Sequence, residues 1–329
     1  MKRVCALAIV LAAGSLPAQA RDLPVGPCIN MGNSLESVPE NAGGRRMMPA
    51  DFARIRAAGF QTVRIPVRWS ARAAKAAPYT IKPGFQRRAV QVVDMALDAG
   101  LNVIVNDHHY EELFTDPAAN AARLAGIWQQ VAAVLAARPT QRLWFEIENE
   151  PHDKLSNANL LATLAPSLAA IRATNPDRPV IIGGDFWSGV DSLATLQLPD
   201  DPNVYPTFHY YEPFRFTHQG APWITSDMPP VGRIYGSSED RQRLKTDLAK
   251  VKAYAARTGL TPFIGETGAY EAYIPLAQRI QYAKAVHDTF APENVAVCQW
   301  AYTNTFPWYD AAGKRWQPGL RAAIGLPED

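Results

Sequence analysis

The sequence predicts an α/β fold, a single-domain (β/α)8 TIM barrel. Short runs rich in β-branched and aromatic residues alternate with long alanine-rich helical patterns along the chain, which is typical of repeated βα units on a parallel sheet. Eight such runs can be counted, the number that closes this barrel. Gly59, Gly100 and Gly259 each precede a run, where a left-handed helix cap suits glycine.

The expected elements follow one another regularly. The strands cover residues 28–33, 62–67, 102–107, 143–149, 180–184, 204–209, 262–266 and 295–300. The clear helices cover residues 49–58, 84–99, 120–137, 157–174, 238–258 and 275–290, with short ones near 190–196 and 318–323. Two long irregular segments, residues 210–236 and 303–317, follow the sixth and eighth strands. They leave the C-terminal ends of strands, the face where such barrels build active sites.

The N-terminus predicts a secretory leader over residues 1–20. Lys2 and Arg3 precede the apolar run 4–13, and Ala18 and Ala20 provide a small-residue cleavage site. We therefore expect the barrel to occupy residues 21–329 and the protein to be secreted or periplasmic. No later run approaches the roughly 18 apolar residues of a membrane span.

Charge excludes several classes of partner. The chain has 33 Lys and Arg against 31 Asp and Glu, and loss of Lys2 and Arg3 with the leader makes the two counts equal. Nucleic acids and anionic membrane surfaces select for a basic excess, which is absent here. We expect a monomer that acts on an uncharged substrate without metal or organic cofactor.

Two cysteines remain after the leader, Cys28 and Cys298. A disulfide between them suits an oxidising compartment. It requires neighbouring strands and side chains on the same face, and two buried free thiols are the alternative.

Polar side chains gather at the predicted C-terminal strand ends. Two carboxylates, Glu150 and Glu266, end separate apolar runs, and Trp and Tyr lie nearby. Such a pair suits glycoside hydrolysis, in which one acid protonates the leaving oxygen and the other meets the oxocarbenium-like transition state. The remaining polar groups at these ends are Asn33, Arg64, His108, His109, Asn149, His209, Tyr211 and Trp300.

A metal-dependent hydrolase is the competing interpretation. His108 and His109 are adjacent, and neighbouring side chains of a strand point to opposite faces, so both cannot bind one ion in the barrel mouth. A sugar-binding protein without activity would lack a carboxylate, and both are present.

The chain resembles glycoside hydrolase family 5, the family of many endo-β-1,4-glucanases, over nearly its whole mature length. The resemblance rests on seven segments: MGNSLE, VRIPVRW, VNDHHY, IENEPH, TFHYYEPFRFTHQGAPW, IGETGAY and QWAYTN. It implies a retaining double displacement on β-1,4-glucan, with β-mannan, xyloglucan or mixed-linkage glucan as alternative substrates.

The resemblance also implies individual roles. Glu150 is expected to be the general acid and base, and Glu266 the nucleophile, with Arg64 and Tyr211 keeping Glu266 ionised. His209 is expected beside Glu150. The residues expected to contact the sugar are Asn33, His108, Asn149, Trp300 and Trp308. About half of Trp69, Trp187, Trp223 and Trp308 are expected to line the cleft, because large aromatics also cover loop cores.

Two further acids precede Glu150. Glu146 is expected to be a buried structural acid. In a regular strand, Glu148 would share a face with Glu146 and Glu150. It would then either pair with a basic residue from the neighbouring helices or raise the pKa of Glu150.

Overall fold

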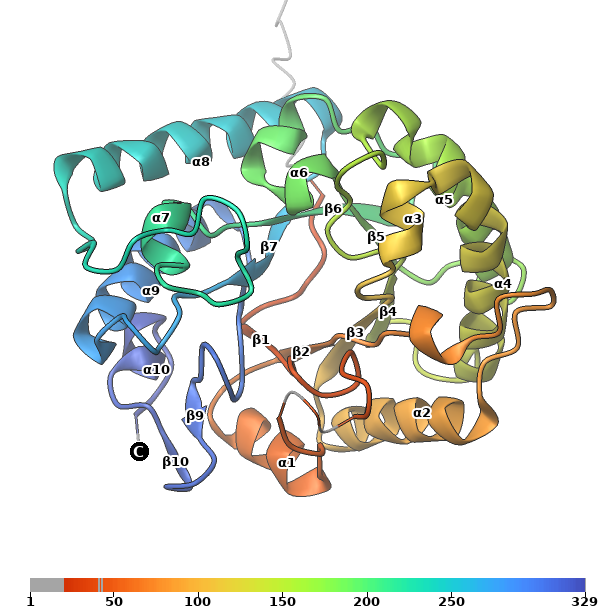
Figure 1. Cartoon of the computed structure of the whole chain (residues 1–329), viewed down its shortest axis with the longest axis horizontal. Coiled ribbons are helices and arrows are strands. Elements are labelled where there is room, and N and C mark those ends of the chain that lie inside the picture. The colour runs from red at the N-terminus through yellow and green to blue at the C-terminus, as the bar shows by residue number, and fades with distance from the viewer. Residues whose placement is uncertain (1–20, 41, 43, 329) are drawn as a thin grey trace, which may run out of the picture.

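The structure is a computed structural model, and it describes residues 21–40, 42 and 44–328. The predicted leader, residues 1–20, lies outside the described residues. Eight parallel strands close into a barrel in sequence order, each paired with the next and β8 with β1, which confirms the predicted fold (Figure 1). The strands are β1 (Cys28–Asn30), β2 (Thr62–Ile65), β3 (Asn102–Asn106), β4 (Leu143–Glu146), β5 (Val180–Gly183), β6 (Val204–His209), β7 (Phe263–Thr267) and β8 (Val297–Gln299).

Helices cover the outside of the barrel. The longer ones are α1 (Pro49–Ala57), α2 (Pro83–Asp98), α4 (Pro117–Leu135), α5 (Asn157–Arg172), α8 (Ser238–Thr258) and α9 (Leu276–Phe290). Their ends follow local chemistry: Asp116 accepts a hydrogen bond from the amide of Ala119 at the start of α4, and Gly259 ends α8 with φ 69°. Among the described residues, no helix combines the length and apolarity that crossing a membrane requires.

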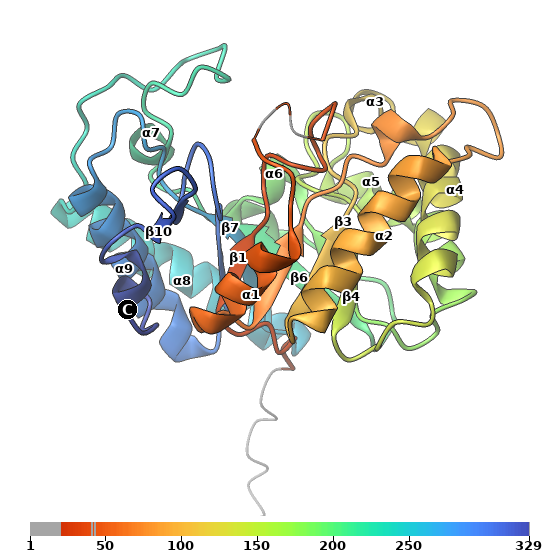
Figure 2. The same ribbon diagram turned by 90° about the horizontal axis from the view of Figure 1, so that it is seen from below.

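Short elements occupy the C-terminal face of the barrel, at the top in Figure 2. These are α3 (Glu111–Thr115), α6 (Asp185–Ser188) and α7 (Phe214–Thr217). The hairpin of β9 (Tyr309–Asp310) and β10 (Arg315–Trp316) and the helix α10 (Leu320–Ala323) follow β8, and α10 lies beside α9 on the outside of the barrel. The sequence patterns did not predict α3, α7 or the hairpin. The two segments expected to be irregular therefore contain small ordered elements.

The barrel interior is layered. Its lower layer is apolar and contains Cys28, Ile104, Trp144, Ile181, Phe263 and Cys298. Two residues further along three of these strands come Asn30, Asn106 and Glu146, all buried. Because side chains two apart share a face of a strand, a polar layer lies directly above the apolar one. The polar layer is the floor of the candidate site.

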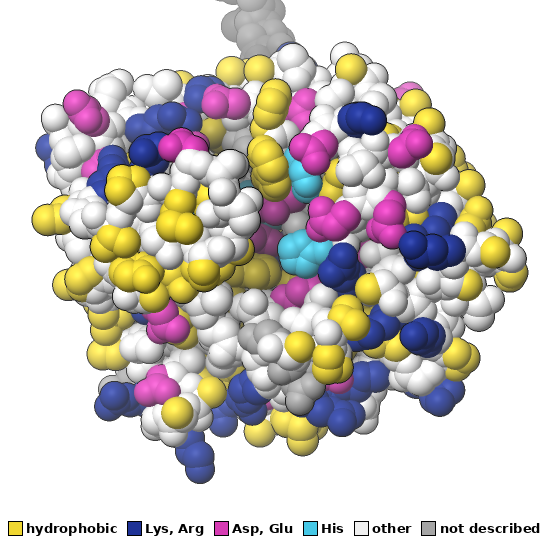
Figure 3. Space-filling model, viewed as in Figure 1, with side chains coloured by type: hydrophobic (Ala, Val, Ile, Leu, Met, Phe, Trp, Pro, Cys, Tyr) yellow, Lys and Arg dark blue, Asp and Glu magenta, His cyan; other side chains and the backbone are white. Residues whose placement is uncertain are grey.

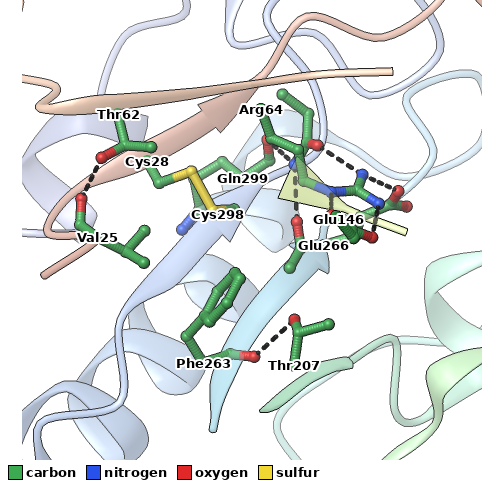
Figure 4. Close-up of a disulfide and its surroundings, with 12 residues drawn as sticks. Val25, Cys28, Thr62, Arg64, Glu146, Thr207, Phe263, Glu266, Cys298 and Gln299 are labelled. Carbon is green, nitrogen blue, oxygen red and sulfur yellow. Dashed lines mark hydrogen bonds and ion pairs between the residues drawn. A yellow bond between two sulfur atoms is a disulfide. The ribbon is translucent and has the colours of Figure 1, made fainter. Parts of the chain in front are cut away.

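A disulfide joins the first and last strands of the barrel. Cys28 and Cys298 are register partners in the β1–β8 pair, and their Cα atoms are 4.2 Å apart. Figure 4 shows the bridge inside the barrel, with Arg64 and Glu266 nearby. The structure thus contains the disulfide and not the alternative of two free thiols, and the two cysteines meet both requirements, adjacent strands and a common face.

Candidate active site

Arg64 is the centre of the polar layer. It lies on β2 with no exposed surface, and its guanidinium donates two hydrogen bonds to Glu146, at 2.6 and 2.7 Å. Its other contacts are Glu266 Oε1 at 2.6 Å, Asn149 Oδ1 at 2.7 Å and Asn30 Oδ1 at 3.0 Å. A buried cation must be paired, so Arg64 fixes the positions of acids from two other strands.

Glu266 lies at the end of β7 and is almost completely buried. Arg64 binds one carboxylate oxygen, and the hydroxyl of Tyr211 donates to the other at 3.0 Å. Burial raises the pKa of Glu266, whereas the proximity of His209 and Arg64 and the Tyr211 hydrogen bond lower it. The predicted contacts are therefore present, but burial outweighs them, and Glu266 ionises above its ordinary value.

Glu150 faces the cleft more openly, with 23% of its side chain exposed against 6% for Glu266. Its Oε1 lies 2.7 Å from Nδ1 of His209. Burial raises the pKa of Glu150 to about 7, against the lowering effect of Arg64. Burial lowers the pKa of His209 to about 4, so this imidazole is neutral near pH 6. Glu150 and Glu266 thus differ in solvent exposure and in hydrogen-bond partners.

The two carboxyl groups lie close together. Oxygens of Glu150 and Glu266 and a ring nitrogen of His209 lie within 4.8 Å of one another. Three such groups could hold a metal ion in principle. The guanidinium of Arg64 is in contact with Glu266 and would repel a cation, while His209 Nδ1 is engaged by Glu150. We therefore assign no ion to this group.

One wall of the site is aromatic. The rings of His108 and Trp300 are stacked, with centroids 5.9 Å apart and planes 4° from parallel. Asn106 lies 3.2 Å from Nδ1 of His108 and orients the ring. The indole of Trp300 packs against Gly32, where a larger residue would not fit, because a Cβ at position 32 would lie 2.7 Å from the indole. Figure 3 shows histidine and acidic side chains in a hollow on this face.

A sequence model described as cellulase, glycosyl hydrolase family 5, matches residues 30–306. The chain belongs to glycosyl hydrolase family 5. Endoglucanase H of Acetivibrio thermocellus is 34% identical over 271 residues, which are 82% of this chain and 29% of that protein. The chain likewise spans 34% of Cellulase/esterase CelE from the same organism. It is therefore much shorter than these two family relatives.

Solved structures match over almost the whole fold. A hyperthermophilic endo-β-1,4-glucanase in complex with substrate has a TM-score of 0.88 and 37% identity, covering 92% of this chain and 97% of its own. Cel5A of Thermotoga maritima, in complex with mannotriose, has a TM-score of 0.88 and 35% identity, covering 91% and 97%. The same protein has also been crystallised with cellobiose.

The structure brings most of the predicted family 5 site residues together. Arg64, Asn149, His209, Tyr211 and the two catalytic candidates form one hydrogen-bonded group. Asn33 lies on the loop after β1, where its amide contacts Thr305 of the loop after β8. Its contact with a sugar remains a prediction.

The expectation for Trp308 was wrong. It was expected to bind substrate, but only 3% of it is exposed, and its ring packs edge-on against buried Phe60. Trp69 is also buried and donates its indole N–H to the carbonyl of Asn106. Trp187 and Trp223 are 54% and 44% exposed. Two of the four tryptophans therefore remain candidates for flanking sugar subsites.

These two tryptophans flank the two acids of the family 5 site. Trp187 stacks on His152 with centroids 4.8 Å apart, and His152 contacts the carbonyl of Glu150. Trp223 contacts His218 edge-on, and His218 contacts Tyr211, the partner of Glu266. Trp187 is thus linked to Glu150 through His152, and Trp223 is linked to Glu266 through His218 and Tyr211.

Glu148 contradicts the expectations about it. Neither of its buried carboxylate oxygens has a hydrogen-bond partner among the described residues, so it forms no pair with a helix cation there. It does not share the direction of Glu146 either, because β4 ends at Glu146 and Asn149 takes the position facing Arg64. Glu146, in contrast, is the buried structural acid that was expected, bound to Arg64.

Sequence reasoning missed Asn30. Its oxygen accepts from Arg64, and its amide donates to the carbonyls of Gly265 and Gln299. It therefore links β1 to β2, β7 and β8. The available signal was an amide residue inside an apolar strand, two positions after Cys28 and hence on the same face.

Proposed function

We propose that the chain is a retaining endo-β-1,4-glucanase. The observation that carries this proposal is the pair of carboxyl groups whose oxygens lie within 4.8 Å. Retaining glycosidases place their two carboxyls about 5–5.5 Å apart, whereas inverting ones leave about 6.5–9.5 Å for a water molecule. The similarity to a hyperthermophilic endo-β-1,4-glucanase, whose structure was solved with substrate, supports the substrate class.

The two acids divide the work in this proposal. Glu266, bound to Arg64 and Tyr211, attacks the anomeric carbon and forms a glycosyl ester. Glu150, with its raised pKa of about 7, gives its proton to the leaving oxygen. It then removes a proton from the water that hydrolyses the ester.

The surrounding side chains position the sugar. Asn149, held by Arg64, is placed to bind the sugar 2-hydroxyl, a contact that strengthens in the transition state of these enzymes. The His108–Trp300 stack provides an aromatic face for the ring at the cleavage point. The chemistry needs no cofactor in this proposal, because both proton transfer and nucleophilic attack come from side chains.

The proposed location of the enzyme rests on the sequence and on the disulfide. The predicted leader over residues 1–20 supports secretion or export to the periplasm. The disulfide between Cys28 and Cys298 agrees with an oxidising compartment. We propose a monomer that acts outside the cytoplasm on a neutral polysaccharide.

A panel of polysaccharides tests the substrate. We expect the highest kcat/KM on soluble β-1,4-glucan, with a rapid fall in viscosity while few reducing ends have appeared, as internal cleavage requires. β-Mannan is the second candidate, because Cel5A was crystallised with mannotriose. A preference for mannan, xyloglucan or mixed-linkage glucan over β-1,4-glucan would replace the proposed substrate, because loops and not the fold set specificity.

The pH profile of kcat/KM should be bell-shaped. Glu266 must be ionised, and burial raises its pKa above the ordinary 4.5, so activity is lost as pH falls toward that range. Glu150 must be protonated, and burial raises its pKa to about 7, so activity is lost as pH rises through about 7. Initial rates between about pH 4 and about pH 9 measure both limbs. An optimum above pH 8 would contradict these assignments.

A further inference from the structure

Two buried carboxyl groups beside the site have no role in the mechanism above. Asp107, at the end of β3, is 0% exposed, and Glu148, after β4, is 2% exposed. Neither forms an ion pair within the described part of the chain. Both oxygens of Glu148 and Oδ2 of Asp107 also lack a hydrogen-bond partner there. Buried polar atoms are almost always paired, so three orphaned oxygens on adjacent strand ends call for an explanation.

The backbone brings these two residues together. The register of β3 and β4 pairs Asn106 with Glu146, and its continuation would give the amide of Glu148 to the carbonyl of Asp107. Instead, the amide of Asn149 donates to that carbonyl at 3.0 Å. Glu148 is therefore an extra residue, a bulge between the two strands. The bulge places Asn149 where its side chain accepts a hydrogen bond from Arg64. It leaves Glu148 close enough to Asp107 for the charges of the two carboxyl groups to interact.

The charges around Glu148 are acidic. Burial disfavours its ionisation most, and Asp107 after β3, Glu146 on β4 and Glu111 on α3 disfavour it as well. The pKa of Glu148 is therefore raised well above the ordinary value, although the backbone amide of Asn149 lowers it. Burial also raises the pKa of Asp107, to about 7, although three backbone amides and Arg123 lower it. Two buried acids of this kind titrate as a pair, and after the first proton has left, the two carboxyl groups share the proton that remains.

We propose that Asp107 and Glu148 share one proton, which holds the ends of β3 and β4 together. Oδ1 of Asp107 already accepts from the amides of Trp69, Ser70 and His108, which suits the ionised form. The proton therefore belongs to Glu148, whose hydroxyl donates to Oδ2 of Asp107. This hydrogen bond satisfies Oδ2 of Asp107 and one of the two orphaned oxygens of Glu148.

The pair acts through its neighbours. His108 follows Asp107, and Asn149 follows Glu148, so one hydrogen bond sets the spacing of two side chains that contact the sugar in the proposed function. Glu148 is a positioning residue and not a catalytic one. The positioning role of Glu148 rests on the proposed function, whereas the proton shared with Asp107 does not. An experiment can therefore contradict one of these claims without contradicting the other.

Thermal unfolding between about pH 4.5 and about pH 8.5 tests the shared proton. Glu148 has a folded pKa above its unfolded value, so the folded state loses stability as pH rises above the unfolded pKa. Glu148→Gln keeps a donor and cannot ionise. Its Tm minus the wild-type Tm should therefore increase steadily with pH. Glu112→Gln, at an exposed acid on the same side of the barrel, is the matched control and should show no such trend.

Asp107→Asn decides whether the proton is shared. The amide keeps an oxygen for the three backbone amides and offers N–H to Glu148, which can then ionise with a donor. The pH trend caused by Glu148→Gln should largely disappear in this background. The proposal would be overturned if Glu148→Gln caused an equally large pH trend in the Asp107→Asn background. It would also be overturned if Glu148→Gln caused no pH trend in the wild-type background. Stoichiometric metal in the purified protein, with Tm lowered by a chelator, would also overturn it.

Enzyme activity tests the positioning role of Glu148. Glu148→Leu and Glu148→Gln have similar volumes, but only Gln can donate to Asp107. We expect kcat/KM on soluble glucan at about pH 6 to fall roughly tenfold in Glu148→Leu and to recover most of that loss in Glu148→Gln. Equal losses in the two variants would show that Glu148 only fills space.

Discussion

Glu266→Gln should abolish turnover while the protein still binds its substrate. The amide is nearly isosteric with the carboxylate but cannot form a glycosyl ester, so kcat should fall by at least about a thousandfold. The fold should persist, because Arg64 keeps its two hydrogen bonds to Glu146. Binding of a cello-oligosaccharide, measured by calorimetry, should stay within about tenfold of wild type, because most of the contacts are unchanged.

The control for this variant is Glu271→Gln. Glu271 is an exposed acid on the loop that follows β7, and its replacement should leave kcat and KM near their wild-type values. Residual activity of more than a few per cent in Glu266→Gln would remove Glu266 from the role of nucleophile. Loss of binding together with turnover would point to a disturbed site instead.

Glu150→Ala should have an effect that depends on the leaving group. Without the acid, hydrolysis of glucan should fall by about 10²–10⁴-fold, the usual contribution of general acid catalysis. An aryl cellobioside with an acidic phenol needs little protonation, so formation of the glycosyl ester should be affected much less. The alkaline limb near pH 7 should also disappear, because the group whose pKa is about 7 is gone.

Equal losses on glucan and on the aryl substrate would contradict the assignment of Glu150 as the acid. The comparison is internal to one variant, so differences in folding or concentration between preparations cancel. His209→Asn provides a second check, since His209 contacts the same carboxyl oxygen without being the proton donor. It should reduce activity on both substrates by similar factors.

Much of the fold could be predicted because its signals are local. The alternation of β-rich and helical runs predicted all eight strands and their order in the barrel. The polar residues near the ends of apolar runs predicted which strands position Arg64, Glu150 and Glu266. Strand ends were less accurate. The strand expected over residues 143–149 stops at Glu146, because the extra residue at Glu148 interrupts its pairing with β3.

That interruption explains the error about Glu148. The period of two that places side chains on a strand fails at a bulge, and the choice of backbone amide that reaches the carbonyl of Asp107 depends on a neighbouring strand. The prediction for Trp308 was wrong for a similar reason. A tryptophan after β8 can face a cleft or a core, and only the position of Phe60 shows which. The cysteine pair likewise needed the β1–β8 register.

The stereochemistry of the first product tests the central claim most directly. An oxygen of Glu150 and one of Glu266 lie within 4.8 Å of each other, closer than the roughly 6.5–9.5 Å that inverting enzymes keep between their carboxyl groups for a water molecule. Proton NMR of a cello-oligosaccharide digest, recorded in the first minutes, should show the β-anomer before mutarotation adds the α-anomer. If the α-anomer forms first, the enzyme inverts, and Glu266 cannot be the nucleophile.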